Sequence, residues 1–170
     1  LFGFSYSKST YRQTLAFNFE KLSQNQLSEF DLVKKAMESH LVSISALFRN
    51  QNFISREEFK NYAIDINQNL ALVKAVGFIE FVPHEKLKDW RKKLQGDDLA
   101  DIYLKTLTSS GFIQTPAQDY YLPITYIEPQ EQNKVALGLD LRSHNIASSA
   151  ALESVESGKV RATPPLRLVQ

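Results

Sequence analysis

Cysteine is absent from the 170 residues, and its absence excludes disulfide bonds, catalysis by a thiolate and zinc sites built from cysteine. Net charge is nearly absent as well, because 20 Lys and Arg residues stand against 19 Asp and Glu. No bulk field would therefore attract nucleic acid or an anionic membrane, and we expect no nucleic-acid partner. No apolar run approaches the roughly 18–20 residues of a transmembrane helix, and no signal peptide is visible.

Motifs for catalysis and metal binding are also lacking. The three histidines are scattered without the spacing of metal ligands: His40, His84 and His144. There is no phosphate-binding loop, no nucleophile elbow and no dinucleotide fingerprint, so we expect no catalytic residue, no metal and no cofactor. One enzymatic alternative stays open, a small hydrolase whose carboxylates converge from the ends of predicted strands. These carboxylates belong to Glu80, Glu128 and Asp140.

Glycine and proline are missing from residues 11–48, where apolar residues recur in steps of three and four and predict one long helix. The apolar stripe consists of Leu15, Phe19, Leu22, Phe30, Val33, Met37, Leu41, Ile44 and Phe48. Such a helix would span roughly 55 Å at 1.5 Å per residue, longer than a compact domain of this size is wide. We therefore expect residues 1–50 to form a stalk that mediates parallel homodimerisation through this stripe.

Residues 51–170 carry a mixture of helix and strand patterns. Ser55 and Glu58 form a capping box before a helix whose buried stripe would be Phe59, Tyr62, Ile66 and Leu70. Further helices are predicted at 84–96 and at 146–157, the latter with Asn145 as its cap and Gly158 just past its end. Strands are predicted at 73–83, 119–129, 135–141 and 160–170, the second and third as an antiparallel hairpin. Residues 97–111 are ambiguous between helix and loop. The fold class is therefore α+β, a long N-terminal helix followed by a sheet with flanking helices.

The predicted strand at 119–129 contains a proline in its interior. Its sequence is DYYLPITYIEP, rich in the aromatic and β-branched residues that favour strands. Pro123 cannot donate a hydrogen bond to a neighbouring strand, so this position should lie at an edge, a bulge or the mouth of a pocket.

Several segments together resemble a CHASE domain, the extracellular or periplasmic sensor of histidine kinases, adenylate cyclases and diguanylate cyclases, which also occurs in plant cytokinin receptors. The segments are, in the order of the family, FISREEFKNYA, KAVGFIEFVP, DYYLPITYIEP, ALGLDLRS and AALESVESGKVRATPPLRLVQ. The resemblance spans roughly residues 40–170. It implies that the sheet is PAS-like and antiparallel, that residues 51–170 form the ligand-sensing unit, and that the family domain is truncated after Gln170.

The resemblance also implies where a ligand would bind. Pro123 would interrupt a sheet whose face is the floor of a pocket, with Tyr121 and Thr125 on one side of the strand because side chains alternate. The positions that match contacts in the cytokinin-type members are Glu128, Leu152 and Thr163. The expected ligand-binding residues are thus Phe81, Tyr121, Pro123, Thr125, Glu128, Leu152 and Thr163.

The resemblance favours a sensor that binds an unknown small molecule outside the cytoplasm, as part of a membrane-anchored receptor of kinase or cyclase type. The resemblance implies no catalytic activity of its own. Two alternatives remain, a dimerisation module without a ligand and the small hydrolase named above.

Overall fold

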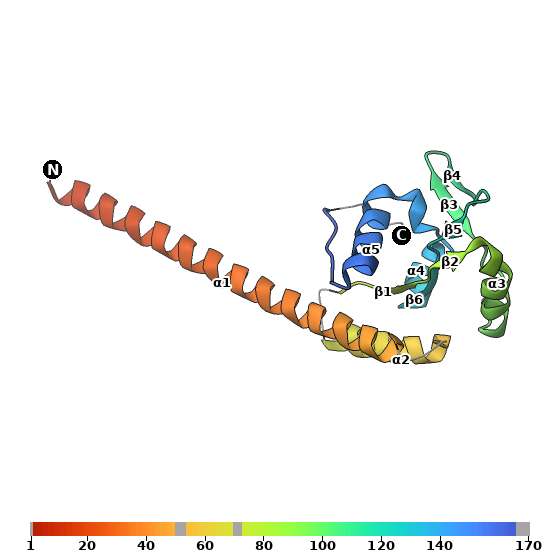
Figure 1. The fold of residues 1–170 in the computed structure, drawn as a ribbon. Helices are drawn as coiled ribbons and strands as arrows, with labels where there is room; N and C mark the ends of the chain where they lie inside the picture. The colour runs from red at the N-terminus through yellow and green to blue at the C-terminus, as the bar shows by residue number, and fades with distance from the viewer. Residues whose placement is uncertain (1, 50–53, 70–72, 166–170) are drawn as a thin grey trace. The chain divides into compact units, whose positions relative to one another are not determined.

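The computed structural model describes residues 2–49, 54–69 and 73–165 (Figure 1). The chain divides into two compact units, residues 1–41 and 42–170. The predicted α+β architecture is confirmed, with a long N-terminal helix followed by a small antiparallel sheet and flanking helices. Among the described residues, no helix has an apolar stretch that could cross a bilayer.

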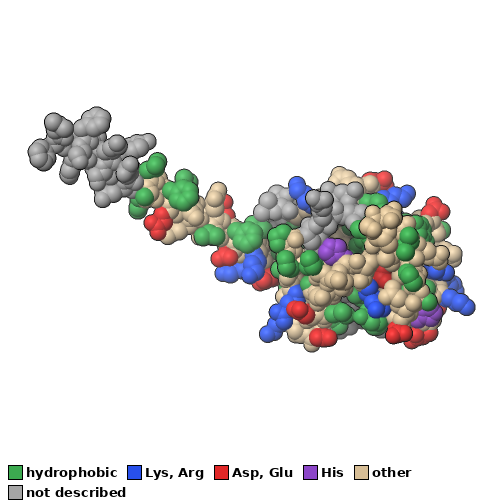
Figure 2. Space-filling model, turned by 90° about the horizontal axis from the view of Figure 1, so that it is seen from above, with side chains coloured by type: hydrophobic (Ala, Val, Ile, Leu, Met, Phe, Trp, Pro, Cys, Tyr) green, Lys and Arg blue, Asp and Glu red, His purple; other side chains and the backbone are tan. Residues whose placement is uncertain are grey.

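Helix α1 spans Phe2–Arg49, so the predicted helix over 11–48 is confirmed and begins earlier. Its 48 residues correspond to about 70 Å at 1.5 Å per residue. The lack of glycine and proline after its first turn removes the residues that most often break a helix. Figure 2 shows apolar side chains along its described part.

Helix α2 (Arg56–Asn69) begins with the predicted capping box. The Glu58 amide donates to the Ser55 hydroxyl (3.2 Å), and the Ser55 amide donates to the Glu58 carboxylate (2.9 Å). These hydrogen bonds hold the pKa of Glu58 below its usual value. Phe59 and Ile66 of the predicted stripe are buried and Tyr62 is half-buried, whereas Leu70 lies outside the described residues.

Two broken strands pair to form the centre of the sheet. Strand β1 (Val76–Ile79) runs antiparallel to β6 (Ile124–Glu128), and β2 (Val82–Pro83) runs antiparallel to β5 (Tyr120–Tyr121). The strands predicted at 73–83 and 119–129 are therefore present, and each is divided in two.

The division occurs at Pro123. The Glu80 amide donates to the Pro123 carbonyl (3.2 Å), and in a hydrogen-bonded antiparallel pair the partner would return a second bond. Proline has no N–H, so this return bond cannot form. On its other side, residue 123 forms an isolated antiparallel bridge with Asp140, whose carboxylate accepts from the Leu122 amide (2.9 Å).

A β-bulge lies next to this proline. Phe78 pairs with Tyr126, but the next residue, Ile79, pairs with Ile124, so Thr125 is the extra residue of β6. A bulge disturbs the regular alternation of side chains. Thr125 and Tyr126 are both buried, as are Ile127 and Glu128 after them, so β6 is covered on both of its faces.

The segment predicted as a strand at 135–141 is not a regular strand, and this prediction is wrong. A 3₁₀ turn (Lys134–Ala136), which follows the short helix α4 (Gln130–Asn133), covers its first two residues, and its residues Leu139 and Asp140 form only isolated bridges. Gly138 has φ +76°, and a side chain there would meet the Tyr103 carbonyl. Because an extended strand requires negative φ, Gly138 turns the chain away from regular pairing.

Residues 97–111, left open between helix and loop, contain strand β3 (Lys105–Thr108), which neither interpretation predicted. This strand forms a hairpin with β4 (Gly111–Gln114). Helix α3 (Leu87–Gly96) follows a 3₁₀ turn and buries Trp90 and Leu94, as its periodicity predicts.

Helix α5 (Asn145–Ser157) ends at Gly158, which is left-handed as predicted. Its N-cap is His144, whose ring accepts from the Ala147 amide, and not Asn145. The predicted final strand is absent from residues 160–165, and its remainder lies outside the described residues. Residues 160–165 are exposed. Two of them are prolines, which cannot donate a hydrogen bond to a sheet.

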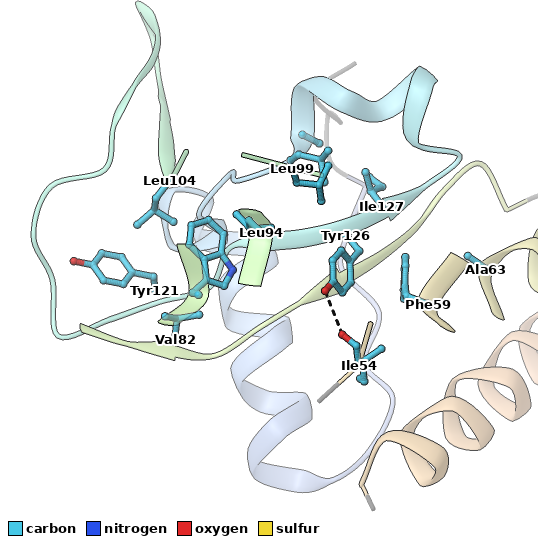
Figure 3. Close-up of a cluster of buried hydrophobic side chains, with 13 residues drawn as sticks. Ile54, Phe59, Ala63, Val82, Leu94, Leu99, Leu104, Tyr121, Tyr126 and Ile127 are labelled. Atoms are coloured by element: carbon cyan, nitrogen blue, oxygen red, sulfur yellow. Dashed lines mark hydrogen bonds between the residues drawn. The ribbon is translucent and has the colours of Figure 1, made fainter. Parts of the chain in front are cut away.

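The core of the second unit is an aromatic and aliphatic cluster around the central sheet (Figure 3). Tyr126 lies in it, with its ring stacked on Phe78 at 5.8 Å between centroids. Its hydroxyl is within reach of the Asp97 carboxylate (2.5 Å) and the Ile54 carbonyl (3.2 Å). One hydroxyl proton serves one acceptor at a time, and the shorter contact with the charged acceptor is the stronger bond.

We predict that Gly138→Ala strongly destabilises the protein. The new Cβ would clash with the Tyr103 carbonyl oxygen, and the backbone must move to relieve the clash. We expect a loss of at least about 2 kcal/mol in the free energy of unfolding, measured by urea denaturation. Gly158→Ala is the matched control, because φ is also positive there but no atom lies within 4 Å. Its expected cost is about 1 kcal/mol, and equal costs at both sites would contradict the clash.

A second prediction concerns pH. Burial and the Asp97 carboxylate raise the pKa of Tyr126 far above its usual value. The unfolded chain loses this proton above about pH 10 whereas the folded chain keeps it, so stability falls as pH rises beyond 10. Tyr126→Phe should cost about 1–3 kcal/mol at pH 7 through the lost hydrogen bond. Above pH 10 the deficit of the variant should shrink by about 1.4 kcal/mol per pH unit, and a constant deficit from pH 8 to 11 would contradict this account.

Candidate functional site

A cleft opens where the central strands are interrupted. It has a volume of about 330 Å³ and lies between α3 and the junction of β1 with β2. We call it the Glu80 cleft. Its lining residues are Glu80, Phe81, Val82, Pro83, Lys86, Asp89, Trp90 and Lys93. Residues 80–83 belong to the stretch whose strand pairing is interrupted opposite Pro123. The other four residues share one face of the helical segment 86–93.

A connected set of polar groups forms the inner wall of the cleft. The buried Trp90 indole N–H donates to the Thr125 hydroxyl (3.0 Å), and this hydroxyl donates to the Glu80 carboxylate (3.3 Å). The same carboxylate oxygen accepts from the Lys93 ammonium (2.9 Å). The Lys93 side chain is largely buried, whereas that of Glu80 is partly exposed. The carboxylate thus connects the core with the open space of the cleft.

The Lys93 ammonium also lies over two aromatic rings. Its nitrogen is 5.6 Å from the centroid of Phe78 and 5.1 Å from that of Tyr126. Partly desolvated cation–π contacts of this kind stabilise a charge that has been removed from water. Lys93 therefore holds Glu80 in place while packing against the core.

The outer rim of the cleft is aromatic and charged. Phe81 is 57% exposed and stacks on Tyr120 with 4.9 Å between ring centroids, while the Arg142 guanidinium covers the Tyr120 ring at 4.1 Å. Lys86 and Asp89 form an exposed ion pair (3.5 Å). Exposed pairs contribute little to stability, so these two side chains are free to exchange partners.

One of the seven predicted site residues lines this cleft, and three others lie behind its wall. Phe81 lines it, Thr125 bonds to two of its lining residues, and Pro123 accepts the Glu80 amide. Tyr121 is fully buried in β5, and its hydroxyl bonds to the His84 ring (2.8 Å) and accepts from the Gln118 amide (3.1 Å). Tyr121 is thus part of the core behind the cleft.

The other three predicted residues are not among those that line the cleft. Glu128 is buried and accepts from the Gln130 amide (3.1 Å). Leu152 is half-buried on α5, and Thr163 is exposed in the segment that follows this helix. A separate open depression of about 350 Å³ lies between α5 and this segment, bordered by Ile146, Glu153, Ala162 and Pro164 among others.

The three carboxylates considered for hydrolysis are occupied in separate interactions. Glu80 bonds Lys93 and Thr125, Glu128 accepts from the amide of residue 130, and Asp140 accepts from the amides of Leu122 and Arg142. The described residues contain no group of three His, Asp or Glu side chains suited to a metal ion. These contacts account for each carboxylate as a structural group.

Sequence reasoning missed the contribution of α3. The sequence predicts a helix at 84–96 but assigns none of its residues to a site, yet Trp90 and Lys93 both line the cleft. Lys86, Asp89 and Lys93 share one helical face through steps of three and four. That spacing, directly after a strand ending in Pro83, was the available signal.

We predict that Thr125→Val destabilises the protein while preserving its shape. The variant keeps the volume of the side chain but leaves the buried Trp90 N–H without its acceptor, which costs about 1–3 kcal/mol. Chemical denaturation and near-ultraviolet circular dichroism of the single tryptophan measure both effects. Thr163→Val is the control at an exposed threonine and should change stability by less than about 0.5 kcal/mol. Equal effects at both positions would exclude the buried hydrogen bond as the cause.

Comparison with known proteins agrees with this architecture. The family model of the CHASE domain matches residues 52–170, which is more than half of the chain. No curated protein matches the chain. CHASE domains are sensor domains and not catalytic ones. The chain therefore belongs to the CHASE domain family.

Proposed function

We propose that this chain is the extracytoplasmic ligand-sensing domain of a membrane-anchored receptor of the histidine kinase or nucleotide cyclase type. A small molecule would bind in the Glu80 cleft, and binding would alter the packing of α1 in a homodimer. The family supports a sensing role. The location and the receptor type are proposed on the resemblance of the sequence to sensors of this kind.

The observation that carries the proposal is the inner wall of the cleft. A pocket for a small ligand typically combines apolar walls with a few convergent polar groups, and Glu80, Lys93 and Trp90 meet there beside Phe81. The volume of about 330 Å³ lies at the lower end of the range of known ligand pockets. Because positive and negative groups are balanced in the lining, we propose a small, amphipathic ligand with an aromatic or apolar body.

Contacts in the core lead from the cleft to a residue just before the N-terminal end of α2. Lys93 touches the Tyr126 ring, and the Tyr126 hydroxyl reaches the Ile54 carbonyl at the start of the α2 region. A ligand that binds Glu80 or Lys93 would alter the first of these contacts. The ligand could shift the equilibrium between two packings of α1 only to the extent that it binds one of them more tightly than the other.

A second candidate function is a dimerisation module without a ligand. The filled interior favours it, because Tyr121, Leu122 and Thr125 are buried and bonded within the domain. In that case the Glu80 cleft would be an unused surface depression. Glu128, Leu152 and Thr163 stay predictions from the resemblance as ligand contacts.

Phe81→Ala separates the two functions. Because Phe81 is exposed and stacked only at the rim, its loss should change the midpoint of thermal unfolding little. Ligands from a library of small amphipathic compounds, screened by saturation-transfer NMR, should bind the variant about five- to thirtyfold more weakly, since an aromatic wall contributes about 1–2 kcal/mol.

Ile113→Ala is the matched control, because this exposed apolar side chain lies on β4 and does not line the cleft. It should bind the same compounds with the affinity of the unchanged protein. A library without any binder, or binders whose affinity is unaffected by Phe81→Ala, would favour the dimerisation module.

A further inference from the structure

We propose that the β3–β4 hairpin binds the carboxylate of a small acid with an aromatic or apolar body, at the ammonium group of Lys105. The site consists of Tyr103, Lys105 and Phe112, which we call the Lys105 cage. None of these three residues lines the Glu80 cleft, so this inference goes beyond the proposed function and does not rest on it.

The first observation is a buried cation without an anionic partner. Lys105 exposes only 9% of its surface. Among the residues that the structure describes, its ammonium group forms no ion pair and no hydrogen bond. Removing an ammonium group from water without a partner is unfavourable, and burial accordingly lowers the pKa of Lys105. Because buried lysines are normally paired, the missing anion calls for an explanation.

A second lysine of the same chain shows what is missing. The ammonium of Lys93 also lies over two aromatic rings, and it pairs in addition with the Glu80 carboxylate at 2.9 Å. The ammonium of Lys105 lies over Tyr103 and Phe112, at 5.7 Å and 5.0 Å from the ring centroids. The two environments therefore correspond except for one carboxylate. A carboxylate from outside the chain would complete the second environment as Glu80 completes the first.

The Lys105 cage is open to solvent, whereas the environment of Lys93 is closed. Tyr103 is 51% exposed and Phe112 is half-buried, but Tyr126, which lies under Lys93, exposes only 2% of its surface. The hairpin also projects from the margin of the second unit (Figure 1). An external acid can therefore approach the ammonium group past the Tyr103 ring without opening the core.

The register of the hairpin places further binding groups on the same face. Gln114 lies directly opposite Lys105, and opposed side chains in an antiparallel pair share a face. Leu107 and Phe112, the pair two residues further along, lie on this face as well. The exposed Gln114 amide can donate to a carboxylate oxygen, and Leu107 adds apolar surface. A few donors among apolar walls are typical of sites for small ligands.

The backbone of Lys105 is fixed on both sides. Its amide donates to the Gly138 carbonyl (2.9 Å), and its carbonyl accepts from the Asp140 amide (2.8 Å). The opposite edge of β3 pairs with β4. A group that is held in position before the ligand arrives loses less conformational freedom on binding, so the ammonium group is well placed to receive an anion.

Titration with benzoate, followed by heteronuclear NMR, tests the site, and benzamide is the neutral probe of the same shape. Benzoate should bind with a dissociation constant of about 1 mM or lower, the scale for a ligand of this size. It should shift the amide signals of residues 103–107 and 112–114. Benzamide should bind at least about tenfold more weakly, because it cannot pair with the ammonium group. Equal binding of the two probes, or no binding of benzoate at about 10 mM, would overturn the inference.

Lys105→Met tests the cation, because the variant keeps a long apolar side chain and removes the charge. Benzoate should bind this variant at least about tenfold more weakly. Its midpoint of urea unfolding should stay the same or rise, since a buried charge without a partner is lost. Lys60→Met, at an exposed lysine of α2, controls for net charge and should bind benzoate like the unchanged protein.

Lys93→Met is the matched control for stability. Its midpoint of unfolding should fall, because the substitution leaves the Glu80 carboxylate without its cation. An equal fall for Lys105→Met, or a loss of its fold, would show that the Lys105 ammonium stabilises the protein by itself. That result would overturn the inference of a missing carboxylate.

The position of the NMR shifts separates this inference from the proposed function. Shifts at residues 103–114 that persist in Phe81→Ala and disappear in Lys105→Met support the Lys105 cage. Shifts at residues 80–93 instead would place benzoate in the Glu80 cleft and overturn the cage while leaving the proposed function intact. The reverse failure, a Glu80 cleft without any ligand, is detected by the screen with Phe81→Ala and does not affect the cage.

Discussion

The missing N–H of Pro123 is the constraint on which the site depends. The carbonyl of this residue accepts the Glu80 amide, but no bond can be returned. The central pairing therefore separates into a four-residue and a two-residue part, β1 with β6 and β2 with β5. Residues 80 and 81 at the separation are released from regular pairing, and they line the cleft.

The bulge at Thr125 converts this gap into a site with defined chemistry. An extra residue in one strand disturbs the regular alternation of side chains at that point. With it, Thr125 binds Trp90 and Glu80 while Tyr126 packs under Lys93. The ion pair of Glu80 and Lys93 is thus supported on both sides by residues that the bulge positions. Breaking such a supported pair costs more than breaking an exposed one.

Sequence reasoning succeeded where the cause is local. The capping box of α2, the uninterrupted length of α1 and the turn at Gly158 depend on residues within a few positions of each other. The strand at 119–129 was also predictable, including some irregularity at its proline.

Sequence reasoning failed where the cause of a structural feature lies in a distant segment of the chain. Gly138 abolishes the strand predicted at 135–141 because its backbone packs on the Tyr103 carbonyl, which no local pattern reveals. The bulge at Thr125 depends on the register with Phe78, and register is a property of two strands. For the same reason the cleft was predicted from the strand alone, without the face of α3 that completes it.

The interrupted sheet also suggests where a ligand could act mechanically. The β2–β5 pair contains two residues on each strand and the β1–β6 pair at least four, so the former has fewer backbone hydrogen bonds to resist displacement. Phe81 and Pro83 belong to the weaker side, whereas Glu80 is held by Thr125 and Lys93. A ligand that bridges Phe81 and Glu80 would therefore move the weaker side toward the stronger one. The free energy available for that movement is the difference in the ligand's binding free energy between the two arrangements. A break in the sheet reduces the free energy that the movement requires.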